Sequence, residues 1–292
     1  FYTGNKIFSE VTVDTVILLL DKTGNKEINL INGLDFFNPS KMAVPPDFFE
    51  KFGNIISVSG DSNSNDVFDK IFNSSNINIE SHFDVFQGIV TGNNAVFIKC
   101  DVTKESDCKA LADTVAEKFG RIDILVNCAG VARRRTVETL SEEDWDLALN
   151  VTLKSVFLMS KHVVPYMKKA GGGKIVNIGS GWALKGGDHA VSYCAAKGGV
   201  WNMTRAMAID HGPDNINVNC VCPGDIDTPM LKSECEQLGG VYDEKYKEEC
   251  AKRPMARLGR PLDVAMCVFF LCSDMAPWVT GSSLVVDGGG IA

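Results

Sequence analysis

The chain has 292 residues, of which 45% are hydrophobic and 23% are charged, a composition that excludes a disordered or fibrous protein. Its net charge of −8 disfavours a nucleic-acid-binding role, because affinity for a phosphate backbone depends on clustered basic side chains. The longest uninterrupted apolar run, residues 264–272, is far shorter than the ~20 residues that cross a bilayer, so we expect no membrane-spanning helix.

The first third of the chain differs in composition from the rest. Residues 1–94 contain no Arg, no Cys and only one Ala, and they are rich in Asn and Phe. From residue 95 onward, Ala, Arg and Cys become common. We predict an atypical N-terminal extension over residues 1–50 and one α/β domain over residues 51–292.

From residue 95 onward, apolar runs of four to seven residues alternate with longer amphipathic stretches, which is typical of strand–helix units in a parallel sheet. Strands are predicted at 95–100, 122–127, 174–178, 215–222 and 283–287, and helices at 104–119, 141–169, 191–211 and 261–273. Ser141, followed by three acidic residues, is predicted to cap the second of these helices. Such a pattern folds into a doubly wound parallel sheet, whose ligands bind at the carboxyl ends of the strands.

Tyr193 and Lys197 are four residues apart on a predicted helix and therefore share one face of it. A nearby cation favours phenolate, so Tyr193 can serve as an acid or base near neutral pH. An isolated pair is weak evidence, because Tyr2 and Lys6 repeat the same spacing elsewhere in the chain. Ser180, just past a predicted strand, is placed to reach the same cleft.

Two further motifs lie at predicted strand ends: Asn127-Cys128-Ala129-Gly130, and Pro223-Gly224-Asp225-Ile226-Asp227-Thr228. Each alone is compatible with ordinary turn chemistry. Together they lie where a doubly wound sheet binds its ligands, which favours a functional interpretation.

The ten cysteines are expected to be reduced thiols in the cytoplasm, because a chain of this length can build its core without a disulfide framework. Their spacings include no C-x-x-C pair, and the chain has no H-E-x-x-H motif. We therefore predict no metal site.

With these motifs, residues 95–292 resemble a classical short-chain dehydrogenase/reductase. The resemblance rests on the segment that begins at Asp101, on N-C-A-G in place of the family's usual N-N-A-G, on the P-G-x-x-x-T motif, and on a last strand ending in V-D-G-G. It also includes a tetrad of Asn150, Ser180, Tyr193 and Lys197. The resemblance implies a single Rossmann-like α/β domain and an NAD(P)-dependent oxidoreductase that interconverts a secondary alcohol and a ketone.

The resemblance also implies roles for individual residues. Tyr193 would exchange a proton with the substrate oxygen, and Lys197 would lower its pKa and contact the nicotinamide ribose. Ser180 would hydrogen-bond the substrate oxygen, and Asn150 would hold a water in the proton relay. The implied cofactor-binding residues are Asp101, Val102, Asn127, Ala129, Gly130, Tyr193, Lys197, Pro223, Gly224, Ile226 and Thr228.

The substrate is predicted to be a small molecule, and residues 228–260 are predicted to form a mobile lid over its cleft. Trp182, His189 and Asp225 are predicted to contact it, although His189 is equally compatible with a surface position and Trp182 with a core one. An aromatic wall with polar groups suits a hydroxylated ring, a sugar or a polyol better than a long acyl chain. The resemblance further implies a homotetramer or homodimer, with the helices at 141–169 and 191–211 in one interface.

The N-terminal third departs from the family pattern. The expected T-G-x-x-x-G-x-G loop, whose glycines allow close approach to a pyrophosphate, is absent. Gly60 follows the best-spaced candidate strand, and Glu80 lies twenty residues later, where an acid can bind the adenosine ribose and favour NAD over NADP. Both are predicted cofactor contacts, so the cofactor is predicted to be NAD or NADP with NAD favoured.

Three explanations of the front third remain open: a divergent half that still binds NAD(P), a replaced half that has lost the cofactor, or an incorrect N-terminal sequence. The alternative function is therefore a catalytically silent family member that serves as a scaffold or binding protein.

Overall fold

The computed structural model describes residues 2–3, 15–16 and 98–292. Strands β1 (Tyr2–Thr3) and β2 (Thr15–Val16) pair antiparallel. The predicted contacts Gly60 and Glu80, and nearly all of the predicted extension 1–50, lie outside the described residues.

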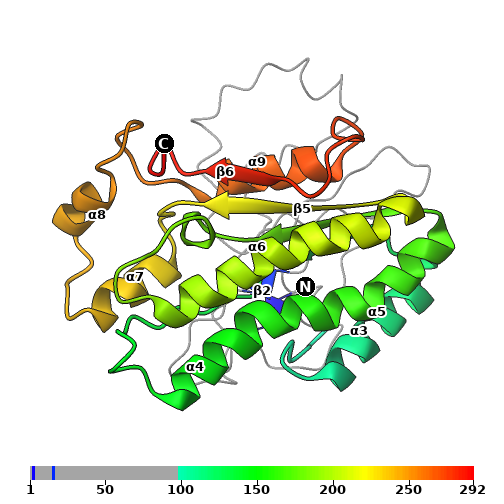
Figure 1. Ribbon diagram of the computed structural model, residues 1–292, viewed down its shortest axis with the longest axis horizontal. Coiled ribbons are helices and arrows are strands. Elements are labelled where there is room, and N and C mark those ends of the chain that lie inside the picture. The colour runs from blue at the N-terminus through cyan, green and yellow to red at the C-terminus, as the bar shows by residue number, and fades with distance from the viewer. Residues whose placement is uncertain (1, 4–14, 17–97) are drawn as a thin grey trace, which may run out of the picture.

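A parallel four-stranded sheet forms the centre of the described domain (Figure 1). Its strands, in spatial order, are β3 (Ile124–Asn127), β4 (Gly173–Ile178), β5 (Ile216–Pro223) and β6 (Ser283–Val286). All neighbouring strands are parallel, so their carboxyl ends meet at one edge of the sheet. The four predicted strands from residue 122 onward are present, with bounds that differ by one or two residues.

Helices cover both faces of this sheet (Figure 1). On one face lie α3 (Glu105–Phe119), α5 (Ser155–Ala170) and α6 (Val191–His211), and on the other lies α9 (Pro261–Cys272). Alternate residues of β3 point into different cores: Leu125 packs with α3 and α5, whereas Ile124 and Val126 pack with α9. This three-layer arrangement confirms the predicted α/β class.

The helix predicted at 141–169 is one continuous helical run with a change of winding in the middle. It comprises α4 (Glu142–Leu149), a π-helical turn (Asn150–Lys154) and α5. Ser141 caps the run as predicted, because its Oγ accepts a hydrogen bond from the Asp144 N–H at 3.1 Å. The π turn was not predicted, and it begins at Asn150, one of the residues of the tetrad.

By length and composition alone, the run 142–170 is apolar enough to cross a membrane. The expectation from uninterrupted apolar runs missed it, because polar residues interrupt this run. Its most apolar stretch is 56% buried within the protein. Leu158, Met159, Val163 and Met167 of this run pack in the main hydrophobic core. These contacts are those of a core helix.

The strand predicted at 95–100 is wrong over its described part, because residues 98–100 have no regular structure. A strand requires a paired neighbour, and within the described residues β3 is the edge of the sheet on that side.

In the predicted lid region, 228–260, the structure has α7 (Pro229–Gln237) and α8 (Glu244–Cys250), beyond the carboxyl ends of the strands (Figure 1). Two 3₁₀ turns, Gly181–Ala183 and Gly212–Asp214, complete the described elements. All ten cysteines are free thiols.

Candidate active site

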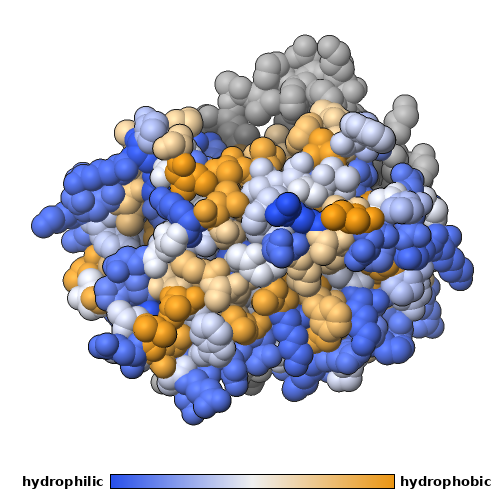
Figure 2. Space-filling view, in the orientation of Figure 1, coloured by the Kyte–Doolittle hydropathy of each residue, from blue (hydrophilic) through white to orange (hydrophobic). Residues whose placement is uncertain are grey.

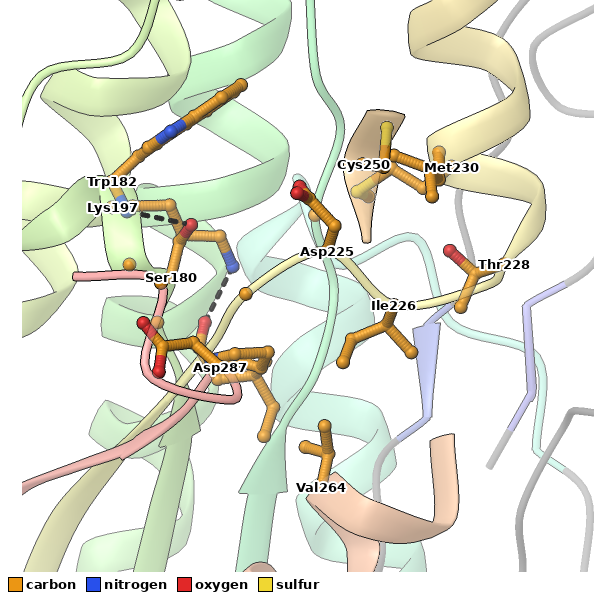
Figure 3. A pocket seen from close by; sticks show the side chains of 18 of the residues that line it. Ser180, Trp182, Lys197, Asp225, Ile226, Thr228, Met230, Cys250, Val264 and Asp287 are labelled. Carbon is orange, nitrogen blue, oxygen red and sulfur yellow. Dashed lines mark hydrogen bonds between the residues drawn. The ribbon is translucent and has the colours of Figure 1, made fainter. Parts of the chain in front are cut away.

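A cavity of about 460 Å³ lies at the carboxyl edge of the sheet, under α7 and α8, and is of a size that takes a small-molecule ligand. Ser180, Trp182 and Lys197 lie on one side of it, and Asp225, Ile226, Thr228 and Met230 lie on the other (Figure 3). The predicted site residues that line this cavity are Gly130, Ser180, Trp182, Tyr193, Lys197, Pro223, Gly224, Asp225, Ile226 and Thr228. The structure therefore brings together residues from three separate strand ends and from helix α6.

Tyr193 lies in the first turn of α6 with its ring buried. Ser180, which caps the short turn after β4, is near enough to the Tyr193 phenol to act on its pKa. Ser180 Oγ accepts a hydrogen bond from the Trp182 N–H at 3.1 Å. The Trp182 ring meets the Tyr193 ring edge to face, with centroids 6.0 Å apart. Both hydroxyls are thus held in fixed positions at the cavity wall.

Lys197 lies one helical turn after Tyr193 and is buried. Its Nζ donates a hydrogen bond to the Ile178 carbonyl oxygen at 2.6 Å and lies 5.6 Å from the centroid of the Tyr193 ring. Burial lowers the pKa of the Lys197 ammonium, because a low-dielectric environment disfavours the charged form.

The acidity of Tyr193 differs from the expectation that Lys197 lowers its pKa. In the structure the pKa of Tyr193 is raised, first by burial and then by the negative charge of Glu234, while Ser180 acts in the opposite direction. The physical reason is that Lys197 is bonded to the Ile178 carbonyl, whereas the phenol is buried beside a carboxylate.

Four predicted cofactor contacts make packing contacts or hydrogen bonds within the domain. Asn127 is buried, and its Nδ2 donates to Asn177 Oδ1 at 2.8 Å across the β3–β4 pair. Val102 and Ala129 are part of the main hydrophobic core. The Asp101 carboxylate accepts hydrogen bonds from the backbone and hydroxyl of Thr103. None of these four residues is among those of region 98–292 that line the cavity.

Two other predicted residues also lie away from the cavity lining found within residues 98–292. Asn150 begins the π-helical turn between α4 and α5. His189 has a positive φ of 48°, and its Nδ1 lies 2.7 Å from the carboxylate of Asp188. His189 is therefore partly exposed and paired with a neighbouring carboxylate.

A buried ion pair was not predicted. Arg134, in the loop after β3, donates from Nη1 to Glu234 Oε2 of α7 at 2.8 Å, and Glu234 lines the cavity. The guanidinium also lies 4.9 Å from the Trp182 ring centroid. Burial raises the pKa of the Glu234 carboxyl, and Arg134 opposes that effect. The two residues are 100 positions apart in the chain, so no local sequence pattern could have paired them.

The chain's residues fit the nicotinamide end of the cofactor that the resemblance implies. At Gly130, a Cβ would lie 3.4 Å from Lys197 Nζ, so glycine keeps the ammonium accessible to a ligand in the cavity. The segment from Pro223 to Thr228 supplies another part of the lining. Lys197 and this segment are the groups that would hold a nicotinamide riboside.

Comparisons with known proteins agree with this geometry. Residues 75–290 match the family described as enoyl-(acyl carrier protein) reductase. The chain is 40% identical over 190 residues to a 3-oxoacyl-[acyl-carrier-protein] reductase of Thermotoga maritima, covering 65% of this chain and 74% of the relative. It is 39% identical over 200 residues to a cyclopentanol dehydrogenase of Comamonas, covering 68% and 77% of the two chains.

Among solved structures, the chain is similar to the aldohexose dehydrogenase of Thermoplasma acidophilum. The TM-score is 0.64 and the sequence identity is 36%, over 69% of this chain and 81% of the other.

Proposed function

Because the chain belongs to the short-chain dehydrogenase/reductase family, and is therefore an NAD(P)-dependent oxidoreductase acting on CH–OH or C=O groups, we propose that it interconverts a secondary alcohol and a ketone on a hydroxylated ring, a sugar or a polyol. The observation that supports this most is the cavity in which Ser180, Tyr193 and Lys197 meet the segment from Pro223 to Thr228. Alcohol oxidation requires an acid or base beside the substrate oxygen and a surface that holds the nicotinamide next to it.

In the proposed reaction, Ser180 Oγ and Tyr193 Oη hold the substrate oxygen, since both residues line the same cavity. During oxidation Tyr193 accepts the alcohol proton, and during reduction it returns a proton to the carbonyl oxygen. When bound, the nicotinamide supplies or accepts the hydride. Lys197, anchored on the Ile178 carbonyl, orients the cofactor ribose.

Asn150 is proposed to contribute to the proton relay through the π-helical turn that it begins. π-Helical turns recur at functional sites because they displace side chains from a regular helical register.

The ring substrate is supported by the walls of the cavity. Trp182 offers a flat apolar surface, while Asp225 and Glu234 offer hydrogen-bond acceptors. Two of the similar proteins are named for a cyclic alcohol and for aldohexoses, and a third is named for an acyl-carrier substrate. The polar acceptors in this chain's cavity favour the first two classes.

NAD rather than NADP remains our proposal for the cofactor and depends on Glu80. We further propose that the enzyme is a homotetramer or homodimer, that it works in the cytoplasm, and that residues 228–260 move as a lid over the bound substrate.

The first test is titration calorimetry of the full chain with NAD(H) and NADP(H). We expect tight binding of one cofactor, weaker binding by Lys197→Ala, and unchanged binding by Tyr193→Phe. A screen of cyclic alcohols and sugars, read as NAD(P)H absorbance, should then yield activity in the wild type and far less in Tyr193→Phe. A folded chain that binds neither cofactor would overturn the proposed function.

A further inference from the structure

Glu234 has an unusual position for a charged side chain, because it is nearly buried and yet lines the catalytic cavity. Met230, one helical turn earlier on α7, points into the same cavity (Figure 3). Residues four apart share a face of a helix, so α7 presents both side chains to the ligand. Glu234 is also close enough to Tyr193 for its charge to influence the phenol.

Arg134 holds Glu234 in place from across the cavity wall. Its Nη1 donates to Glu234 Oε2 at 2.8 Å, and its Nη2 donates to the Asp188 carbonyl at 2.9 Å. The Arg134 N–H donates in turn to Gln237 Oε1 at 2.9 Å, and Gln237 Nε2 donates to the Ala132 carbonyl at 3.2 Å. These hydrogen bonds join the loop after β3 to the end of α7. The one from Arg134 Nη1 holds the Glu234 carboxylate directly.

A carboxylate can accept about four hydrogen bonds. Within residues 98–292, the hydrogen bond to the Glu234 side chain comes from Arg134 alone. The remaining acceptor capacity of Glu234 is therefore available to a ligand in the cavity. A buried ion pair contributes little to folding relative to well-packed apolar residues, so a ligand-binding role accounts better for this pair than stability does.

We propose that Glu234 is a specificity-determining residue that accepts a hydrogen bond from a second hydroxyl of the substrate, at a carbon other than the one oxidised. The enzyme then prefers cyclic diols and polyols to cyclic mono-alcohols. This inference rests on the proposed function, because it assigns a substrate class to the same cavity. Arg134 is a positioning residue that keeps the carboxylate ionised and aimed at the ligand.

The experiment compares kcat/KM for cyclohexanol with kcat/KM for the 1,2-, 1,3- and 1,4-cyclohexanediols, at pH 8 and with the preferred cofactor. Wild type is expected to prefer at least one diol by tenfold or more. Glu234→Gln should reduce that preference about tenfold, or about 1.4 kcal/mol, because a neutral acceptor replaces a charged one. The ratio of two substrates is independent of the fraction of enzyme that is folded.

Glu236→Gln is the matched control, since Glu236 is an exposed residue of the same helix that pairs with Lys232. It should retain the wild-type ratio. The double substitution Arg134→Met with Glu234→Leu removes both charges together, which avoids leaving a buried guanidinium unpaired. It should abolish the diol preference while leaving cyclohexanol a substrate.

The outcomes separate the two proposals. If wild type oxidises cyclohexanol or the diols and the diol preference is missing, or survives both Glu234 variants, the role of Glu234 is overturned while the proposed function stands. If wild type oxidises no cyclic alcohol, diol or sugar with either cofactor, the proposed function fails and this inference fails with it.

Discussion

Tyr193 is the residue on which the proposed proton transfer depends most directly. Tyr193→Phe removes only the phenolic oxygen and should lower kcat/KM for alcohol oxidation about 10²- to 10⁴-fold, the usual contribution of a positioned acid or base. The dissociation constant of the cofactor should not change. Steady-state kinetics and calorimetry measure the two quantities separately.

Tyr166→Phe is the matched control for this substitution. The Tyr166 hydroxyl donates to Asp113 at 2.7 Å between α5 and α3, away from the cavity. Its removal should leave kcat/KM unchanged. A Tyr193→Phe enzyme with wild-type kcat/KM would show that another group transfers the proton.

The charge of Glu234 should set the pH range in which Tyr193 works as a base. Its negative charge raises the pKa of Tyr193, because it disfavours the phenolate. Glu234→Gln removes that charge, so the pKa of Tyr193 should fall and phenolate should persist to lower pH. The acidic limb of kcat/KM against pH, measured for cyclohexanol oxidation, should move to lower pH in this variant and stay in place in Glu236→Gln. If the acidic limb of the kcat/KM profile of Glu234→Gln moved to higher pH, the assignment of Tyr193 as the titrating group would be contradicted.

The sequence predicted which candidate catalytic side chains lie together better than it predicted their surroundings. Ser180, Tyr193 and Lys197 could be predicted to meet because each follows or begins an element at the same edge of a parallel sheet. The Arg134–Glu234 pair could not be predicted, because it depends on how α7 folds back on a loop 100 residues away. The hydrogen bond from Asn127 to Asn177 on β4 could not be predicted either, because it depends on the register of the two strands.

Among the elements, the junction of β4 and β5 fixes Ser180 through Gly179. A Cβ on residue 179 would lie 2.6 Å from Cys220 Sγ and 2.8 Å from Cys222 Sγ, which is closer than atoms can approach. Gly179→Ala should therefore destabilise the fold by about 1–3 kcal/mol, as overpacking does. It should also lower kcat, since Ser180 is the next residue. Thermal denaturation and kinetics would measure the two effects.

Adding Cys220→Ala to Gly179→Ala removes the nearest sulfur and should restore part of both losses. Gly186→Ala is the control, because nothing lies within 4 Å of a Cβ at that position. If Gly179→Ala were as stable and active as Gly186→Ala, the close packing of this junction would be refuted.

Element boundaries were predictable where local chemistry determines them. The helix at 191–211 was predicted with the bounds of α6, and Ser141 marks the start of the run 142–170. The π-helical turn at 150–154 could not be predicted, since its residues have no composition that distinguishes them from an α-helix. The strand at 95–100 failed over residues 98–100 because strand formation depends on a neighbour as well as on an apolar sequence.

For the whole molecule, the oligomer that we propose has its predicted interface on the helices at 141–169 and 191–211. On the face where α4, α5 and α6 lie toward the viewer, Figure 2 shows hydrophobic surface interspersed with polar surface. Phe157 of α5 is 49% exposed and Ile209 of α6 is 77% exposed. Light scattering of the full chain should give the mass of a dimer or tetramer. Phe157→Asp or Ile209→Asp should reduce that mass, because a buried unpaired charge opposes association.

Trp278→Asp is the control for these surface substitutions, since Trp278 is 95% exposed outside both helices. It should leave the mass unchanged. If Trp278→Asp dissociates the protein while the helix variants do not, the predicted interface is wrong.

The parallel sheet has a consequence for the time course of folding. Each ladder joins strands that a helical crossover separates, and the β3–β4 pair brings together Asn127 and Asn177 from 50 positions apart. Closing such long loops before their contacts form is entropically slow. The cavity needs all four strand ends, so it is complete only after the last ladder has formed. On refolding from denaturant, recovered enzymatic activity should therefore lag behind the recovery of helical circular dichroism, and the active enzyme will be the last species to appear.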